Sequence, residues 1–286
     1  MEEQEYWESE PMEMAERWEY NLSLFLDCLD DSNPKVRANA ITNLWEYAER
    51  EIMERFLEMA VSDPSPAVRC KAISGLGRYV YEGEIMDFEV PDPYIDDWMT
   101  QEDYKRVYDF LVAIGADSQR SFDEKRFAVE ALSFVHNDTV YDLIAGLYAM
   151  PEKQAKISAL FAMGRNGAER WLDILGNEIW SRDIEIQVEA IDAAGEMNAE
   201  PLSKDLCRLT YSHDKKVVMS AIWALGQTGT SCVFERLDEL TLDADPDVSE
   251  LADAALEEWM LFNHFAAESE EEEEDWGLMG DDDLLF

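Results

Sequence analysis

Apolar residues recur along this chain in blocks that repeat every 31 residues. The segments SPAVRCKAISGLG (65–77), EKQAKISALFAMG (152–164) and DKKVVMSAIWALG (214–226) each place apolar residues four before, at, one after and four after a central alanine. This is the spacing of a helix with one buried face. We call these central residues the anchor alanines, and they are Ala40, Ala72, Ala128, Ala159, Ala190, Ala221 and Ala252.

A second helical segment precedes the later anchored helices, so the repeating unit is a pair of helices. Apolar residues of these first helices are also 31 apart, at Ile144, Leu175, Leu206 and Leu237. The turn sequences DSNP, SDPSP, SHD and DADPD separate the two helices and offer N-cap residues. No segment alternates over enough length to predict a strand. The pattern therefore predicts an all-α protein built from stacked helix pairs.

The repeat resembles a short HEAT-type repeat of the kind found in the phycobilisome-lyase HEAT-like family. The resemblance covers roughly residues 21–262 and rests on the anchor alanines, on two VR pairs and on two LG pairs: Val36-Arg37, Val68-Arg69, Leu76-Gly77 and Leu225-Gly226. It implies a right-handed α-solenoid of about seven helix pairs, in which each pair buries its apolar face against its neighbours. The motif specifies this architecture and does not by itself specify an activity.

Three acidic segments fall outside the repeat. The interval from Ala72 to Ala128 is 56 residues, which is one repeat plus about 25 residues. We predict the following organisation: an acidic N-terminal arm or helix over 1–20, the solenoid over 21–264 with an acidic insert at about 83–99, and an acidic, disordered C-terminal tail over 265–286. A helix capped by Thr100 is expected directly after the insert.

Charge narrows the classes of partner. The chain has 65 acids against 23 bases and a formal net charge of −42. Binding to nucleic acid or to anionic membrane needs clustered Lys and Arg, so we expect neither. The charge favours a protein partner that is basic, or serves solubility alone.

The cysteines and the apolar runs predict a cytoplasmic protein. The four cysteines lie far apart and form no CxxC pair, so they are expected to be reduced. The N-terminal sequence MEEQEYWESE has no apolar signal region, and no apolar run approaches the roughly 18 residues of a membrane helix.

Residue patterns typical of catalysis are missing from the sequence. None of the three histidines shares a helix face with a cysteine or another histidine, so metal-ligand spacing is absent. Cys70 lies between Arg69 and Lys71, which can lower the pKa of a thiol, but a packed structural cysteine is the favoured interpretation. We therefore predict no catalytic residues, no metal and no cofactor.

The second helices should line the concave side of a solenoid, and there the positions two and six after each anchor point away from the core. These positions hold Phe134, Phe161 and Trp223, where water-facing residues are expected. We predict a partner-binding groove of Arg78, Phe134, Ile157, Phe161, Arg165, Met219, Trp223 and Gln227. The alternative is that neighbouring helices cover these rings.

The acidic segments also carry large apolar residues, which a purely solvating arm does not need. We predict interaction arms that use Trp98, Trp276, Leu284, Leu285 and Phe286. The tail is then a plug for its own groove or a hook for another protein, and the alternative for each segment is a solvated arm.

These observations together favour a non-enzymatic scaffold or adaptor that binds protein through its concave face and its arms. Two alternatives stay open. One, implied by the resemblance, is an enzyme or enzyme subunit of the bilin-lyase kind. The other is an acidic mimic or chaperone for a basic protein.

Overall fold

The computed structural model describes residues 18–86, 99–228 and 231–261, and every regular element within them is a helix. The predicted all-α fold is confirmed. In these described ranges no helix is both long enough and apolar enough to cross a membrane. The chain divides into two compact units, an N-terminal unit of Met1–Met150 and a C-terminal unit of Pro151–Phe286.

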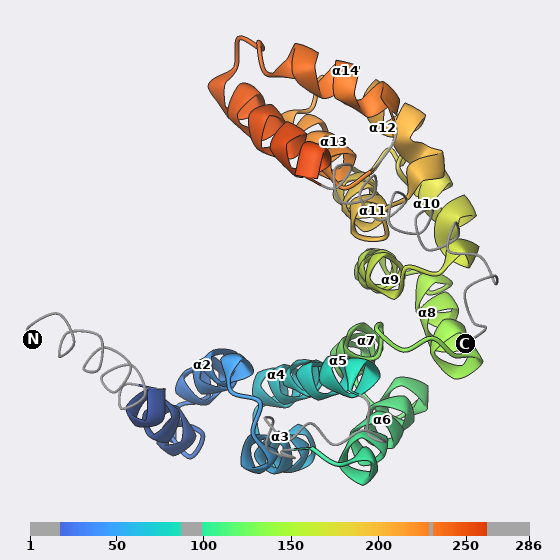
Figure 1. Cartoon of the computed structure of the whole chain (residues 1–286). Coiled ribbons are helices and arrows are strands. Elements are labelled where there is room, and N and C mark those ends of the chain that lie inside the picture. The colour runs from blue at the N-terminus through green and yellow to red at the C-terminus, as the bar shows by residue number, and fades with distance from the viewer. Residues whose placement is uncertain (1–17, 87–98, 229–230, 262–286) are drawn as a thin grey trace, which may run out of the picture. The chain divides into compact units, whose positions relative to one another are not determined.

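The N-terminal unit contains helices that pack in two layers. Its elements are a helix over 18–28, α2 (Pro34–Asn43), η1 (Leu44–Glu46), α3 (Arg50–Ser62), α4 (Pro66–Gly75), α5 (Gly77–Ile85), α6 (Gln101–Ala116), α7 (Phe122–Ala131) and α8 (Asp138–Tyr148). The anchored helices α2, α4 and α7 contact one another in sequence order, and α3 and α6 pack against them (Figure 1).

The C-terminal unit repeats this arrangement with greater regularity. Its elements are α9 (Lys153–Asn166), η2 (Glu169–Trp171), α10 (Leu172–Glu178), α11 (Ile184–Glu196), η3 (Glu200–Leu202), α12 (Ser203–Leu209), α13 (Lys215–Gly226), α14 (Ser231–Leu240) and a helix over 246–261. The anchored helices α9, α11 and α13 lie side by side in one layer. Helices α10, α12 and α14 form a second layer that packs against it (Figure 1). We call α9, α11, α13 and the helix over 246–261 the second-helix layer.

The anchor alanines are buried, as the repeat predicts. Each has at most 2% of its surface exposed: Ala40, Ala72, Ala128, Ala159, Ala190, Ala221 and Ala252. The repeated apolar residues of the first helices are fully buried as well: Ile144, Leu175, Leu206 and Leu237. The 31-residue period therefore identifies core residues in both units.

Glycines at a fixed position in the repeat bring the helices of the second-helix layer close together. A Cβ atom added at Gly164 would lie 2.7 Å from the backbone Cα of Ala193, and one at Gly226 would lie 3.1 Å from the Cα of Ala255. At Gly195 the same atom would lie 2.9 Å from the Cα of Ala224. These three glycine–alanine contacts form one line across the layer, which we call the glycine seam.

The long interval between Ala72 and Ala128 contains an extra helix. α5 follows α4 after Leu76 and packs against α6 and α7. It runs to Ile85, so the first residues of the predicted insert are helical, whereas residues 87–98 lie outside the described residues. The predicted cap of α6 is confirmed, because the Thr100 hydroxyl accepts from the Asp103 backbone N–H and the Asp103 carboxylate accepts from the Thr100 backbone N–H.

Candidate functional site

The predicted groove residues fall in both units. Arg78 and Phe134 belong to the N-terminal unit, and six others belong to the C-terminal unit: Ile157, Phe161, Arg165, Met219, Trp223 and Gln227. All eight are half-buried rather than fully exposed. One predicted arm residue, Trp98, and four predicted tail residues, Trp276, Leu284, Leu285 and Phe286, lie outside the described residues.

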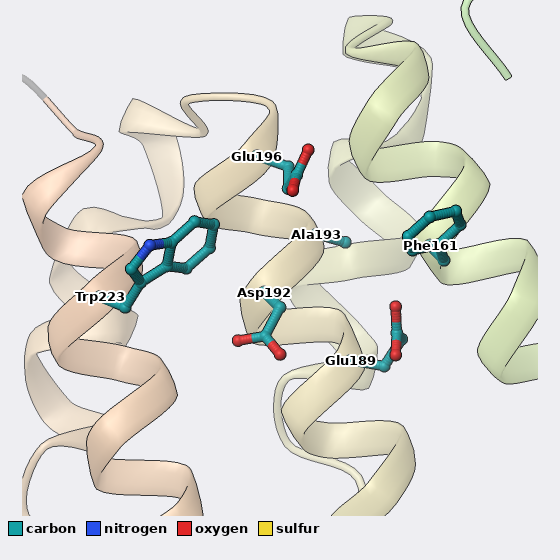
Figure 2. A pocket seen from close by; sticks show the side chains of 6 residues that line it. All are labelled: Phe161, Glu189, Asp192, Ala193, Glu196 and Trp223. Carbon is teal, nitrogen blue, oxygen red and sulfur yellow. The ribbon is translucent and has the colours of Figure 1, made fainter. Parts of the chain in front are cut away.

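A cavity opens on the second-helix layer of the C-terminal unit. It has a volume of about 440 Å³ and is lined by Phe161, Glu189, Asp192, Ala193, Glu196 and Trp223. Phe161 comes from α9 and Trp223 from α13, and α11 supplies the four residues between them (Figure 2). The structure thus brings the two predicted aromatic residues together around one space.

Helix periodicity explains the floor of this cavity. Asp192, Ala193 and Glu196 lie three, four and seven residues after Glu189, so all four share one face of α11. Figure 2 shows the carboxylates distributed along that helix between the two aromatic side chains. Ala193 also lines the cavity, and it packs closely against Gly164 of α9.

The glycine seam positions the tryptophan. A Cβ atom on Gly195 would lie 2.6 Å from the Trp223 ring, so the ring rests directly on the backbone of α11. The N-termini of α11 and α13 are fixed in the same way, because the Asp183 and Asp214 carboxylates each accept a backbone N–H two residues further on. The floor helix α11 and the Trp223 helix α13 are therefore packed against each other and capped at their N-termini.

The cavity is negatively charged, and one of its acids is poorly solvated. Burial raises the pKa of the Asp192 carboxyl above its ordinary value, a hydrogen bond donated by Ser220 opposes that shift, and the charge of Glu196 adds to it. An ionised Asp192 in this position is held at a cost that a nearby cation would relieve.

Arg165 lies beside the cavity rather than in its lining. Its guanidinium is 4.4 Å from the centroid of the Phe161 ring, a cation–π contact within α9. Ile157 lies one turn before Phe161 on α9, and Met219 lies one turn before Trp223 on α13.

The predicted groove residues of the N-terminal unit make separate contacts. Phe134 lies just past the end of α7, and its ring packs edge-on against Tyr81 with centroids 4.9 Å apart. Arg78 on α5 forms an ion pair with Glu82 at 2.7 Å.

A second cavity, of about 530 Å³, lies in the N-terminal unit between α4 and α7. Its lining includes Cys70, Lys71, Arg126 and Phe127. Burial raises the pKa of the Cys70 thiol to about 11, and the neighbouring acids add to the shift. A nucleophile must be a thiolate, so a thiol that stays protonated at neutral pH supports the structural role favoured from the sequence.

The repeat pattern predicts only part of the site. Phe161 and Trp223 were found because both lie two residues after an anchor alanine. Asp192 occupies the same position in the repeat between them, which is a signal that could have placed it in the site. Glu189 precedes its anchor by one residue and gave no such signal.

Within the described residues, no group of three or more His, Cys, Asp or Glu side chains could hold a metal ion.

Comparison with known proteins finds a family similarity for part of the chain. Residues 22–87 match the family of HEAT repeats. The matched stretch begins in the helix over 18–28 and ends just after α5. This part of the chain consists of HEAT repeats, as the sequence motif predicts. None of the curated proteins matches the sequence.

Solved structures extend the likeness over most of the chain. The complex of CpcE and CpcF of phycocyanin lyase from Nostoc sp. PCC7120 is similar with a TM-score of 0.50 and 14% identity, covering 83% of this chain and 94% of that chain. Importin beta has a TM-score of 0.49 and 12% identity over 83% of this chain and 36% of its own. Human deoxyhypusine hydroxylase has a TM-score of 0.38 and 14% identity over 84% of each chain. The likeness to the CpcE and CpcF complex shows a shared fold and agrees with the resemblance read from the repeats.

Proposed function

We propose that this chain is a non-enzymatic HEAT-repeat scaffold that binds a protein partner through the second-helix layer of its C-terminal unit. The observation that carries the proposal is the cavity between Phe161 and Trp223. Aromatic side chains that fill or line a pocket are typical hot spots of protein–protein interfaces, because they contribute much of the binding energy. The rings are half-buried on a layer of closely packed helices, which reduces the side-chain freedom that a partner has to restrict on binding.

Replacing both aromatic walls tests the proposal. We expect Phe161→Asp with Trp223→Asp to weaken partner binding by at least about tenfold, because two desolvated ring contacts are lost and two more charges are added. The measurement is affinity capture from a lysate of the source organism with quantitative mass spectrometry, together with helical circular dichroism to show that the fold persists.

A matched control lies on the same unit. Trp180 and Tyr211 are exposed, at 44% and 66%, and lie in turns away from the cavity. Trp180→Asp with Tyr211→Asp makes the same change in charge and should leave capture unchanged. Equal capture by wild type and the Phe161/Trp223 variant would overturn the proposal.

The acidic arms are proposed to add to this binding as hooks. Residues 267–286 contain ten acids and no base, and they carry Trp276 and the apolar end Leu284, Leu285 and Phe286. Capture with a chain that lacks residues 267–286 separates a hook from a solubilising arm, because only a hook changes the set or yield of partners.

A second candidate function is a subunit of a bilin lyase. The fold likeness to the phycocyanin lyase complex, which covers 94% of that chain, is the observation that favours it. The test is co-expression of this chain with a phycobiliprotein and a bilin, scored by the visible absorbance of the purified phycobiliprotein. Absorbance no higher than in cells without this chain would exclude the candidate for that substrate.

A further inference from the structure

The cavity of the C-terminal unit combines two aromatic walls with an acidic floor. Its six described lining residues are two aromatics, three acids and one alanine, and none of these six is basic. The cavity of the N-terminal unit differs, since Lys71 and Arg126 take part in its lining. Charge complementarity therefore separates the two cavities and gives the C-terminal one a preference for a cationic occupant.

The acids of the floor are arranged to act on one ligand. Glu189, Asp192 and Glu196 share a face of α11, so a cation between the rings meets carboxylates from successive turns (Figure 2). Coulomb attraction is strengthened where rings exclude water, and a cation would also relieve the unfavourable environment of Asp192. The net charge of −42 raises the local concentration of basic ligands before contact.

The two walls favour a guanidinium over an ammonium group. A guanidinium is planar, stacks on aromatic faces and offers five N–H donors in a fork that fits carboxylates. The chain itself uses this contact repeatedly: Arg208 lies 4.9 Å from the ring centroid of Trp180, and Arg236 lies 3.8 Å from that of Tyr211. The same chemistry is available to an arginine that enters the cavity from another protein.

Building on the proposed function, we infer that the cavity between Phe161 and Trp223 binds arginine side chains of a basic segment in the partner protein. The Trp223 ring stacks on the guanidinium, and the carboxylates of α11 accept its hydrogen bonds. Phe161, whose ring centroid lies 4.4 Å from the guanidinium of Arg165, forms the opposite wall. The acidic C-terminal residues have the wrong charge for this place, which favours their role as a hook over a plug of this cavity.

A peptide of defined chemistry tests the inference. The probe is a fluorescent, end-blocked octapeptide of alternating arginine and glycine, titrated against the full chain at roughly physiological ionic strength, where the Debye length is about 8 Å. A citrulline–glycine peptide keeps the shape of the side chain without its charge. A lysine–glycine peptide keeps the charge without the planar guanidinium group. We expect the arginine peptide to bind, the lysine peptide to bind several-fold more weakly and the citrulline peptide not to bind.

Two variants locate the binding. Asp192→Asn preserves shape and Trp223→Ala removes one wall, and each should weaken the arginine peptide by about tenfold, the loss typical of an interface hot spot. Glu235→Gln, at an exposed position of α14, changes the net charge by the same amount as Asp192→Asn. Trp180→Ala removes an exposed ring outside the cavity. Both controls should stay within about twofold of wild type, because surface contacts contribute little.

Several outcomes overturn the inference. Equal weakening by Asp192→Asn and Glu235→Gln would mean that the peptide follows the overall charge of the chain. If the citrulline peptide binds, or if the lysine peptide binds as tightly as the arginine peptide, the cavity does not select a guanidinium group. Circular dichroism identifies unfolded variants, and Asp192→Asn keeps the test decisive if Trp223→Ala fails to fold.

The inference and the proposed function fail independently. If the Phe161/Trp223 double variant loses its partner while the wild-type chain ignores the arginine peptide, the proposed function stands and the arginine inference falls. If peptide binding depends on Asp192 while partner capture is indifferent to the double variant, the cavity binds arginine and the proposed function falls.

Discussion

Single glycines decide how closely the helices of the C-terminal unit approach. In the glycine seam, a methyl group at Gly164 would meet the backbone of the next helix, which cannot move aside as a side chain can. At Gly176 in α10 the nearest atom is the side-chain methyl of Leu202, at 3.3 Å. The two positions have the same residue type and differ only in what surrounds it.

We expect Gly164→Ala to lower the free energy of unfolding by about 1–2 kcal/mol. Overpacking against backbone costs more than the roughly 1 kcal/mol that alanine gains over glycine inside a helix. Gly176→Ala in the same unit should be neutral or mildly stabilising, because Leu202 can shift its methyl group. Urea denaturation followed by circular dichroism measures both, and equal effects at the two positions would contradict the packing role of the seam.

Individual site residues were predictable only where the repeat gives them a phase. The position two after the anchor marks Phe161, Asp192 and Trp223 in three consecutive repeats. Aromatic residues at that phase attract notice because water-facing positions seldom hold them, whereas an aspartate there looks ordinary. The charge of the cavity emerges only when the helices are side by side, since it depends on which residues line the same space.

Pairs of helices are linked by ion pairs between a motif arginine and a buried carboxylate of a neighbouring repeat. Arg37 contacts Asp63 at 2.8 Å, and Arg69 contacts Glu124 at 2.8 Å. The second link joins α4 to α7, which the inserted residues separate in sequence. The partner of Arg69 across the insert follows from the fold alone, because the repeat pattern does not connect residue 69 with residue 124.

Glu124 should make this link dependent on pH. Burial alone would raise the pKa of its carboxyl, but hydrogen bonds from Arg69 and Ser121 outweigh burial and lower the pKa from 4.5 to about 2. The ionised form is thus favoured by folding, so its contribution is complete above pH 4.5 and is lost as the pH falls toward 2.

Glu124→Gln is therefore expected to destabilise the chain by about 2 kcal/mol at neutral pH, leaving Arg69 without its carboxylate. The difference from wild type should shrink below pH 4.5 and vanish near 2. Urea denaturation across this pH range measures it. Glu58→Gln, which breaks an exposed pair with Arg55, should cost under about 0.5 kcal/mol at any pH, and a constant penalty for Glu124→Gln would refute the linkage.

At the scale of the whole molecule, the repeats make the architecture predictable, whereas elements outside the repeats are not. The all-α solenoid architecture and the core alanines follow from a 31-residue period, because each helix pair makes the same contacts with its neighbours. α5 breaks the period and was not predicted as a separate helix. Its packing against α6 and α7 depends on contacts that occur once in the chain.

Part of the acidic charge of the chain is concentrated at the cavity of the C-terminal unit. A net charge of −42 is spread over the sequence and gives no site by itself. The cavity gathers three of these acids between two rings, where charge selects a ligand rather than merely keeping the protein soluble.

Gly195 lies beneath the Trp223 ring, so the wall of the cavity rests on the packing surface that spaces the helices. A residue that never meets the ligand thus shares an atomic contact with one that does. During evolution, ligand preference can consequently drift by two routes. One changes the side chains that face the partner, and the other changes the support behind the tryptophan while every ligand-facing residue stays the same.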